Sequence, residues 1–273
     1  MNPSPASGLS SVQKACRILS ELSDPGPHRL SNIVGNTGIN KATALRLLDM
    51  LMDEGFVVRN AEDKCYALGN EALVMRAAVP RRAQFPECAR DSLVRLAEVS
   101  GDAACLSISC GSYAVCIARE EGSYPLRANY LHIGRRLPLG VGSGALAILA
   151  WLPSDEVDHI MERNRAALAR FPRVSAERIR REIRGARERG YVLASNVVCE
   201  GTGGIAVPIL DEHGRPIAAL GATALSSRLV ERQEMLASLL RSEAQLIQAS
   251  LRRRPAPGLA DTSKAVETVD VGA

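Results

Sequence analysis

The spacing of apolar residues over the first 54 positions predicts three short helices. The first is marked by an apolar stripe at helical spacing and ends at Asp24-Pro25-Gly26-Pro27; the stripe is Val12, Ala15, Ile18, Leu19 and Leu22. A second helix is predicted over 30–36, followed by a tight turn at 37–40. The third is predicted over 41–54 and ends before Gly55, with four residues facing inward: Leu45, Leu48, Leu51 and Met52.

The pattern then changes from helical to strand-like. Residues 56–59 and 65–68 are predicted strands, and the polar segment 60–64 joins them into a hairpin. A helix over 70–77 precedes a predicted linker boundary at Pro80-Arg81-Arg82. Helix, turn, helix and hairpin in this order predict a winged helix-turn-helix domain over 11–69. We expect a flexible tail over 1–10, and a linker helix and linker over 70–84.

Residues 85–252 predict a second, larger domain. Its helices are predicted over 86–100, 142–152, 154–162, 175–189 and 230–251. Its strands are predicted over 103–109, 113–119, 126–130, 191–196, 205–210 and 216–225. Two groups of three strands separated by helices predict an α+β domain with a mainly antiparallel six-stranded sheet. Residues 253–273 are expected to be a disordered tail.

Composition agrees with two soluble domains and removes several function classes. The chain has 273 residues, 46% of them hydrophobic and only 3% aromatic, so aliphatic side chains must fill the cores. No apolar run approaches the ~18 residues of a membrane span, and the polar start does not read as a signal peptide, so we expect a cytoplasmic protein with no membrane contact. The seven cysteines include no C-x-x-C pair, which favours buried thiols over metal ligands, and no cofactor or metal is expected.

The net charge of the chain is compatible with DNA binding but does not by itself indicate it. The net charge is +4, but residues 1–77 hold eight basic and eight acidic side chains, so the placement of charge must matter more than its total. The second helix of a helix-turn-helix presents its N-terminal residues to base edges, which here are Asn40, Lys41, Thr43, Ala44 and Arg46. Arg59 and Lys64 would lie beside the DNA backbone, although Glu62 and Asp63 weaken the hairpin as a phosphate clamp. The alternative is a helical subdomain whose hairpin contacts protein.

Several runs resemble the isocitrate lyase regulator (IclR) family of bacterial transcription factors. In the first domain these are LSNIV from Leu30, TGINKAT from Thr37, EGF from Glu54 and YALG from Tyr66. In the second they are GRRLPL from Gly134, AILA from Ala147, RERGY from Arg187 and GTGGIAVPI from Gly201. The resemblance keeps the same order from the first helix to the last.

The resemblance implies a sequence-specific regulator that binds a double-stranded DNA operator as a homodimer, or as a homotetramer. It also implies a GAF-type second domain whose pocket binds a small organic effector, such as a carboxylate or an aromatic acid. Residues carried over from the family pattern to this pocket are Ser143, Gly144, Ala194, Thr202, Gly204, Gly221 and Thr223. Ala194 and Ile205 are expected to be the nearest apolar contacts.

The residues themselves support an anion site. Gly140, Gly142, Ser143 and Gly144 open a predicted helix, whose free N–H groups can hold an anion. The glycines could also serve tight turns alone. Gly140, Leu146 and Gly221 stand where many family members carry His, Lys and Ser, which favours a larger and more apolar acid than glyoxylate.

Two other function classes agree less well with the sequence. An enzyme would need chemistry that the sequence does not announce, because it contains no G-x-S-x-G, H-E-x-x-H or Walker motif and its four histidines lack partner spacing. A regulator that binds protein rather than DNA stays open, because the first domain is electrically neutral overall.

Overall fold

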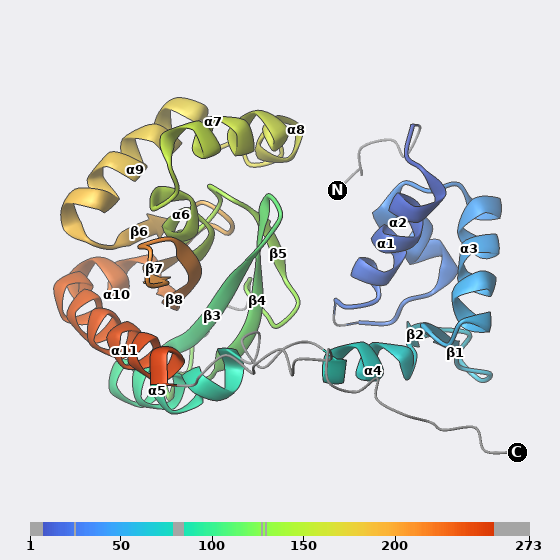
Figure 1. The fold of residues 1–273 in the computed structure, drawn as a ribbon, viewed down its shortest axis with the longest axis horizontal. Helices are drawn as coiled ribbons and strands as arrows, with labels where there is room; N and C mark the ends of the chain where they lie inside the picture. Colours follow the sequence, from blue (N-terminus) through green and yellow to red (C-terminus); the bar gives the residue numbers. More distant parts are fainter. Residues whose placement is uncertain (1–7, 25, 79–84, 127, 129, 254–273) are drawn as a thin grey trace, which may run out of the picture. The chain divides into compact units, whose positions relative to one another are not determined.

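The computed structural model describes residues 8–24, 26–78, 85–126, 128 and 130–253. The chain forms two compact units, one up to Pro80 and one from Arg81 onward (Figure 1). Most of the predicted tail 1–10, the linker 79–84 and nearly all of the tail 253–273 lie outside the described residues.

The N-terminal unit is a three-helix bundle with a small hairpin. Its helices are α1 (Ser11–Glu21), α2 (Leu30–Thr37) and α3 (Lys41–Asp53), followed by β1 (Val57–Arg59), β2 (Tyr66–Leu68) and α4 (Glu71–Ala78). Ser10 and Gln13 form a reciprocal capping box that starts α1. A shared core of Ile18, Ile33 and Leu48 holds the three helices together, and each of these side chains is fully buried.

The inward face of α3 differs from the predicted one. Ala44, Leu47 and Leu48 are buried, whereas Leu45 is 40% exposed. The buried positions follow helical spacing from Ala44, and Leu45 lies about 100° further around the helix. The prediction that Leu45 faces inward and Ala44 outward is therefore wrong.

The C-terminal unit is built on one six-stranded antiparallel sheet in the order β5-β4-β3-β8-β7-β6. The strands are β3 (Ala103–Cys110), β4 (Tyr113–Glu120), β5 (Arg136–Pro138), β6 (Val192–Ser195), β7 (Thr202–Leu210) and β8 (Pro216–Leu225). The helices are α5 (Phe85–Ser100), α6 (Ser143–Ala150), α7 (Ser154–Arg163), α8 (Arg165–Leu168), α9 (Ala176–Arg189), α10 (Ser226–Glu231) and α11 (Gln233–Arg253).

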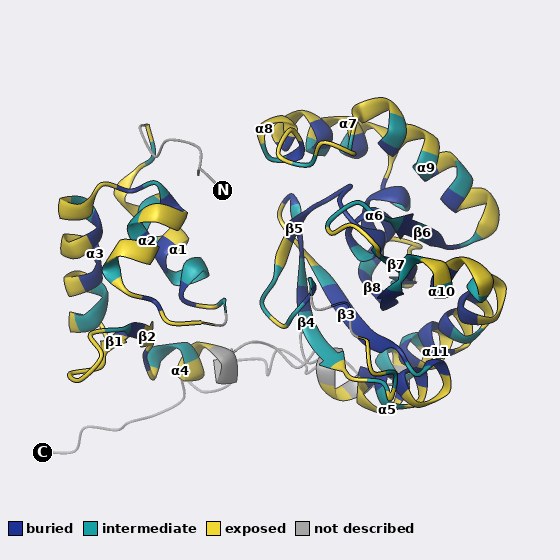
Figure 2. Cartoon of the chain, turned by 180° about the vertical axis from the view of Figure 1, so that it is seen from behind, coloured by how far each residue is buried: buried dark blue, intermediate teal, exposed yellow. Residues whose placement is uncertain are grey.

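Each face of the sheet carries its own core. On one face α6, buried at every residue except the half-buried Gly144, packs with α7 and α9; on the other, α5 and α11 pack against the sheet (Figure 2). Both faces are buried, so β7 and β8 read as nearly continuous apolar runs. The predicted α+β class, with a helix-turn-helix followed by a six-stranded antiparallel sheet, is confirmed.

Three details of the predicted second domain are wrong. The third strand is Arg136–Pro138 rather than 126–130, because the later segment pairs with β4. In the earlier segment Leu126 is 59% exposed while Ala128 is buried, and none of its described residues, Leu126, Ala128 and Tyr130, lies in a strand. The predicted helix 230–251 is divided at Arg232, whose guanidinium bonds Asp102 and the Ser100 carbonyl. The short helix α8 was not predicted.

Candidate DNA-recognition helix and effector pocket

The turn before α3 is built to start the recognition helix. Gly38 adopts a left-handed conformation with a φ of 69° at the end of α2. Two residues later the Asn40 side chain accepts a hydrogen bond of 2.9 Å from the Thr43 backbone N–H, capping α3. Asn40 therefore stabilises the start of α3 by capping it, and it is also exposed at that end of the helix.

Three of the predicted DNA-contacting residues of α3 lie on its open side. Lys41 and Arg46 are exposed and Thr43 is half-buried. Ala44 is fully buried in the bundle core, so its prediction as a base-contacting residue is wrong. The helix thus offers two cations and one hydroxyl near its N-terminus.

The hairpin places its two predicted cations differently. Arg59 stacks over the Tyr66 ring, with its guanidinium carbon 5.3 Å from the ring centroid. Lys64 has a φ of 59°, and its ammonium donates to the Ala61 carbonyl at 2.6 Å. The acidic Asp63 accepts the Cys65 backbone N–H at 2.8 Å, so this carboxylate shapes the turn.

The second site begins at the turn into α6. Gly140 and Gly142 have φ values of 105° and 79°, and a β-carbon on Gly140 would lie 2.9 Å from Cδ1 of Ile179. Gly142 is the N-cap of α6, and no side chain caps this helix. The first-turn N–H groups, including those of Ser143 and Gly144, lack an intrahelical acceptor, which makes this helix end suited to an anion.

A pocket lies directly at this helix end. Its empty volume is about 280 Å³, and its lining comes from β3, β4, the β4–β5 connection, β5 and α6: Ser107, Ala114, Tyr130, Leu131, Leu137, Gly142, Ser143, Gly144 and Ala145. We call it the α6 pocket. The Ser107 and Ser143 residues are buried there, and the described lining includes no carboxylate.

Strand register brings the small sheet residues to the same place. Ala194, Gly204 and Thr223 are paired in one row across β6, β7 and β8. A β-carbon on Gly204 would meet the Ser143 hydroxyl and would lie 3.1 Å from Oη of Tyr130. Only a glycine at position 204 leaves room for these two polar side chains. The Thr223 hydroxyl is buried and forms no hydrogen bond of ordinary geometry among the described residues; the Cys105 thiol lies beside it.

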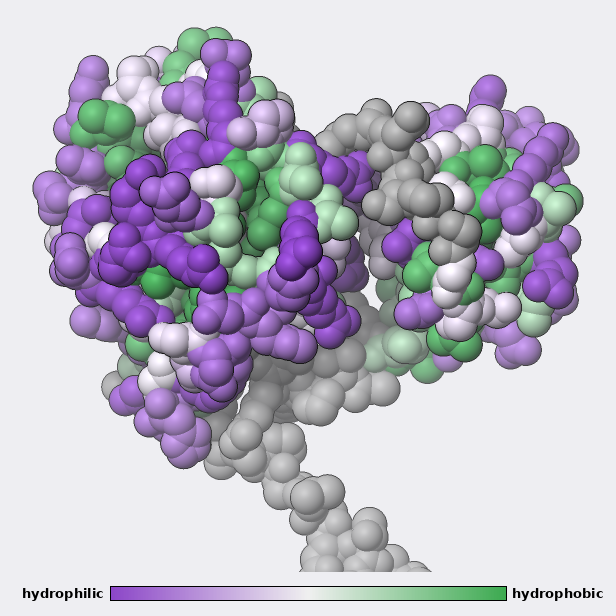
Figure 3. All heavy atoms as spheres, turned by 90° about the horizontal axis from the view of Figure 1, so that it is seen from above, coloured by the Kyte–Doolittle hydropathy of each residue, from purple (hydrophilic) through white to green (hydrophobic). Residues whose placement is uncertain are grey.

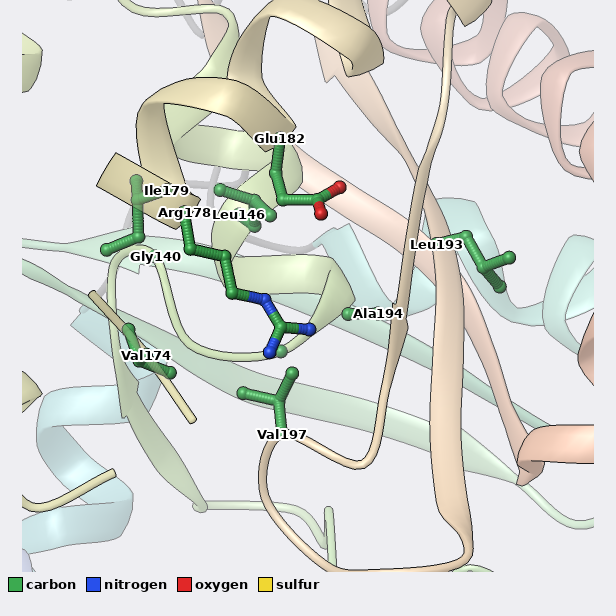
Figure 4. Close-up of a pocket in the computed structure, with 10 residues that line it drawn as sticks. Gly140, Leu146, Val174, Arg178, Ile179, Glu182, Leu193, Ala194 and Val197 are labelled. Carbon is green, nitrogen blue, oxygen red and sulfur yellow. The ribbon is translucent and has the colours of Figure 1, made fainter. Parts of the chain in front are cut away.

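A second pocket, which also has Gly142 in its lining, lies between α9 and β6 (Figure 4). It has an empty volume of about 320 Å³ and an apolar lining that includes Leu146, Ile179 and Val197. Arg178 extends from α9 toward Ala194 and Val197, and its Nη1 donates to the Arg173 carbonyl at 2.8 Å. The face of this unit near α7 to α9 shows apolar surface enclosed by hydrophilic side chains (Figure 3).

Two titratable groups beside the α6 pocket, Tyr130 and Cys105, are held neutral. Burial raises the pKa of the Tyr130 phenol. A hydrogen bond to the Cys116 thiol, together with burial, raises the pKa of Cys105. Because neither group carries a negative charge near neutral pH, neither opposes an anion at the end of α6.

The structure groups most of the predicted effector residues and separates two of them. Ser143 and Gly144 line the α6 pocket, Gly204 lies against Ser143 and Tyr130, Thr223 is paired with Gly204, and Ala194 lines the second pocket. The Thr202 hydroxyl instead donates to the Cys199 carbonyl at 2.9 Å. Gly221 pairs with Ala206 in the adjacent row, and a β-carbon there would lie 2.7 Å from the Ile205 carbonyl oxygen.

Ile205 was predicted to contact the effector, and this is wrong. Its side chain belongs to the core between the sheet and α11, on the face opposite α6. Neighbouring strand residues point to opposite faces, so Ala206 takes the α6 side instead.

Sequence reasoning missed Ser107, Tyr130 and Arg178. Ser107 is a polar residue inside an apolar strand, which is a signal that could have been used. Nothing in the local pattern singles out Tyr130 or Arg178. Within the described residues, no cluster of three or more metal-binding side chains occurs, and no helix combines the length and apolarity needed to cross a membrane.

Both units match models of one family. Residues 11–61 match the IclR helix-turn-helix domain, and residues 78–249 match the bacterial transcriptional regulator IclR C-terminal domain. The HTH-type transcriptional regulator XynR of Escherichia coli (strain K12) is 29% identical over 245 residues, which are 89% of this chain and 95% of XynR. The transcriptional repressor IclR of the same strain is 24% identical over 232 residues, covering 83% of this chain and 84% of the repressor.

Solved structures share the fold. An IclR transcriptional regulator from Alicyclobacillus acidocaldarius has a TM-score of 0.72 at 22% identity, covering 89% of this chain and 99% of its own. An IclR homolog from Microbacterium hydrocarbonoxydans, solved in complex with 4-hydroxybenzoate, has a TM-score of 0.70 at 24% identity. The match covers 90% of this chain and 100% of the homolog. With both domain models matched over most of its length, the chain belongs to the IclR family of bacterial transcriptional regulators, which are DNA-binding proteins rather than enzymes.

Proposed function

We propose that this regulator binds a small, largely apolar organic acid in the α6 pocket, and that binding changes its affinity for an operator. One observation carries the proposal. The uncapped first turn of α6 carries the buried Ser143 hydroxyl and lies over Gly204, which has no side chain and is paired in the sheet with the buried Thr223. Backbone N–H groups, hydroxyl donors and the helix dipole together favour a carboxylate there.

The remaining lining favours an aromatic or bulky aliphatic acid. The lining residues Ala114, Leu131 and Leu137 are apolar. In the adjacent sheet, Ala194 and Gly204 are paired and have small or no side chains. A polar acid such as glyoxylate would leave this lining uncovered. The 4-hydroxybenzoate complex of the Microbacterium homolog, which shares the fold, supports an aromatic acid as the ligand class.

On the DNA side, we propose that Lys41, Thr43 and Arg46 contact the major groove and that Asn40 orients them. Arg59 and Lys64 would contact the backbone beside it. We assign 11–69 to DNA binding, 70–84 to the linker and 85–252 to effector binding. A single recognition helix covers few base pairs, so the protein is proposed to bind as a homodimer or homotetramer. Exposed apolar residues of α4, with Leu73 at 64% and Met75 at 54%, support a partner for that helix.

The test measures effector and DNA binding on the full chain. Benzoate and 4-hydroxybenzoate should raise the melting temperature of the protein, and glyoxylate should not, because a ligand of the folded state alone stabilises it. The same acids should shift the midpoint of binding to an operator fragment selected from genomic DNA. Thr223→Val should remove both effects.

Ser195→Ala is the matched control. The Ser195 hydroxyl is also buried without a partner among the described residues, but Ser195 alternates with Ala194 and so faces away from α6. This variant should respond to the acids as wild type does. A wild-type protein that none of the acids stabilises, or equal responses from Thr223→Val and wild type, would contradict the proposed function.

A further inference from the structure

The connection between β4 and β5 carries Tyr130 across the α6 pocket. Tyr130 and Leu131 both line this pocket, and Oη of Tyr130 lies 3.1 Å from where a β-carbon on Gly204 would be. The Tyr130 phenol and the Ser143 hydroxyl therefore fill the position that a side chain on Gly204 would take.

An effector ring cannot take this space while the phenol is there. A ligand atom in contact with the Gly204 backbone would stand near the position of a β-carbon, which Tyr130 and Ser143 already crowd. Although the empty volume beside the phenol is about 280 Å³ with its open mouth, the cavity that admits a water-sized sphere is only about 10 Å³, far below the ~300 Å³ lower limit for ligand pockets. With a carboxylate proposed at the α6 end, an attached ring needs more room than the pocket has while Tyr130 lines it.

Hydrogen bonds to β4 hold the β4–β5 connection at residues close to Tyr130. The Arg119 guanidinium donates to the Leu131 carbonyl, and the Gly134 N–H donates to the Cys116 carbonyl at 2.8 Å. These contacts are made by Leu131 and Gly134, on the β5 side of Tyr130, and do not involve the Tyr130 side chain. Tyr130 is itself only half-buried, and Leu126 and Ile133 on either side of it are 59% and 57% exposed.

We propose that Tyr130 occupies the ring subsite of the effector, and that an aromatic acid binds by displacing the phenol from Gly204. Tyr130 is then the residue that sets the largest ring the site accepts. This inference rests on the proposed function, because it takes the carboxylate to lie at the end of α6. If the phenol must leave first, the apparent affinity for every aromatic acid equals its intrinsic affinity multiplied by the fraction of molecules in which the site is open.

The experiment compares benzoate with 2-naphthoate by calorimetry on the full chain. In Tyr130→Leu the side chain stays apolar but is too short to reach Gly204. The preference for 2-naphthoate over benzoate should rise at least about tenfold in this variant, the scale expected when an apolar pocket gains room. Tyr130→Phe keeps the ring in place, so its preference should stay within about threefold of wild type.

Tyr113→Leu is the matched control. Tyr113 is also half-buried and on β4, but it neighbours Ala114, which lines the pocket, and so points to the other face of the sheet. Its preference should equal that of wild type. If Tyr130→Leu shows no change in preference while Thr223→Val loses benzoate binding, the inference is wrong and the proposed function stands. If wild type binds neither acid, both are wrong.

A second measurement avoids any folding defect of Tyr130→Leu. The chain has five tyrosines, so wild type labelled with 3-fluorotyrosine gives five fluorine resonances, and Tyr130→Phe identifies one of them. Saturating benzoate should move the Tyr130 resonance more than the other four. A Tyr130 resonance unmoved by an acid that calorimetry shows to bind would overturn the inference.

Discussion

The Ser143 hydroxyl lies over Gly204 at the point where a β-carbon would stand. These residues are far apart in sequence, on α6 and β7, and the sheet floor meets the helix end only because position 204 has no side chain. Gly204 has no positive φ, so an alanine there would be limited by space and not by backbone strain.

Gly204→Ala should therefore weaken effector binding more than folding. The new methyl group would push Ser143 out of the anion site, and we expect at least about a tenfold loss of benzoate affinity, equal to 1.4 kcal/mol. Calorimetry and a melting curve on one sample separate the two effects. The double variant Ser143→Ala/Gly204→Ala should regain part of the ring contact, since the clash is gone. A Gly204→Ala protein with unchanged affinity would show that the pocket lies elsewhere.

Gly144→Val should fill the α6 pocket while leaving the fold intact. A β-carbon at Gly144 would lie 3.5 Å from the Ser107 hydroxyl, which is ordinary contact, and Gly144 is not among the residues with positive φ. The strain that a β-branched residue would suffer in a left-handed conformation does not apply here. We expect loss of benzoate binding with operator binding retained. A folded variant that still binds benzoate would refute this placement.

Arg46→Ala should weaken operator binding. If the guanidinium contacts a base, discrimination at that base should fall by about 1–3 kcal/mol. If it contacts phosphate only, affinity should fall for all sequences and the salt dependence should flatten by roughly one charge. Arg180→Ala is a charge-matched control, because Arg180 is exposed and pairs with Asp158 in the C-terminal unit. Equal affinities of the two variants would mean that α3 does not read the DNA.

The stability of the C-terminal unit should depend on pH through Glu243. Burial alone would raise the pKa of Glu243, but hydrogen bonds from Arg95 and Ser92 lower it overall. A depressed folded-state pKa gives stability above the unfolded value near 4.3 and loses it as pH falls through the folded value. Glu243→Gln should cost roughly 1.5–3 kcal/mol at pH 7 and progressively less below pH 4. A difference in unfolding free energy that is constant from pH 7 to pH 3 would contradict this origin.

The full chain should scatter light as a dimer or larger at micromolar concentration. Leu73, Val74 and Met75 on α4 are each more than half exposed, which is unusual for three consecutive large apolar residues. Replacing Leu73 and Met75 with Glu should shift the population toward monomer if α4 is part of the contact. A monomeric wild type would remove the dimer proposal.

Local patterns were enough to predict most of the elements. The stripe from Val12 to Leu22 and the hairpin alternation from Phe56 to Leu68 each predict an element within a few residues of its observed bounds. The glycines before Ser143 predict an open helix N-terminus, because glycine tolerates the positive φ found at Gly140 and Gly142. These features depend on neighbouring residues, which a sequence displays directly.

Only the tertiary structure decided which residues meet. Ile205 and Ala206 are both fully buried, so the strand pattern alone does not show which of them faces α6. Ala44 is fully buried, but alanine is common on both the buried and the exposed faces of helices, so the residue type alone does not show which face it takes. Tyr130 reaches Gly204 because the chain between β4 and β5 crosses the pocket before it pairs as a strand, and residues 74 positions apart in sequence come within contact. Contacts of this kind follow from how the sheet closes over its helices, and no local spacing of residues encodes them.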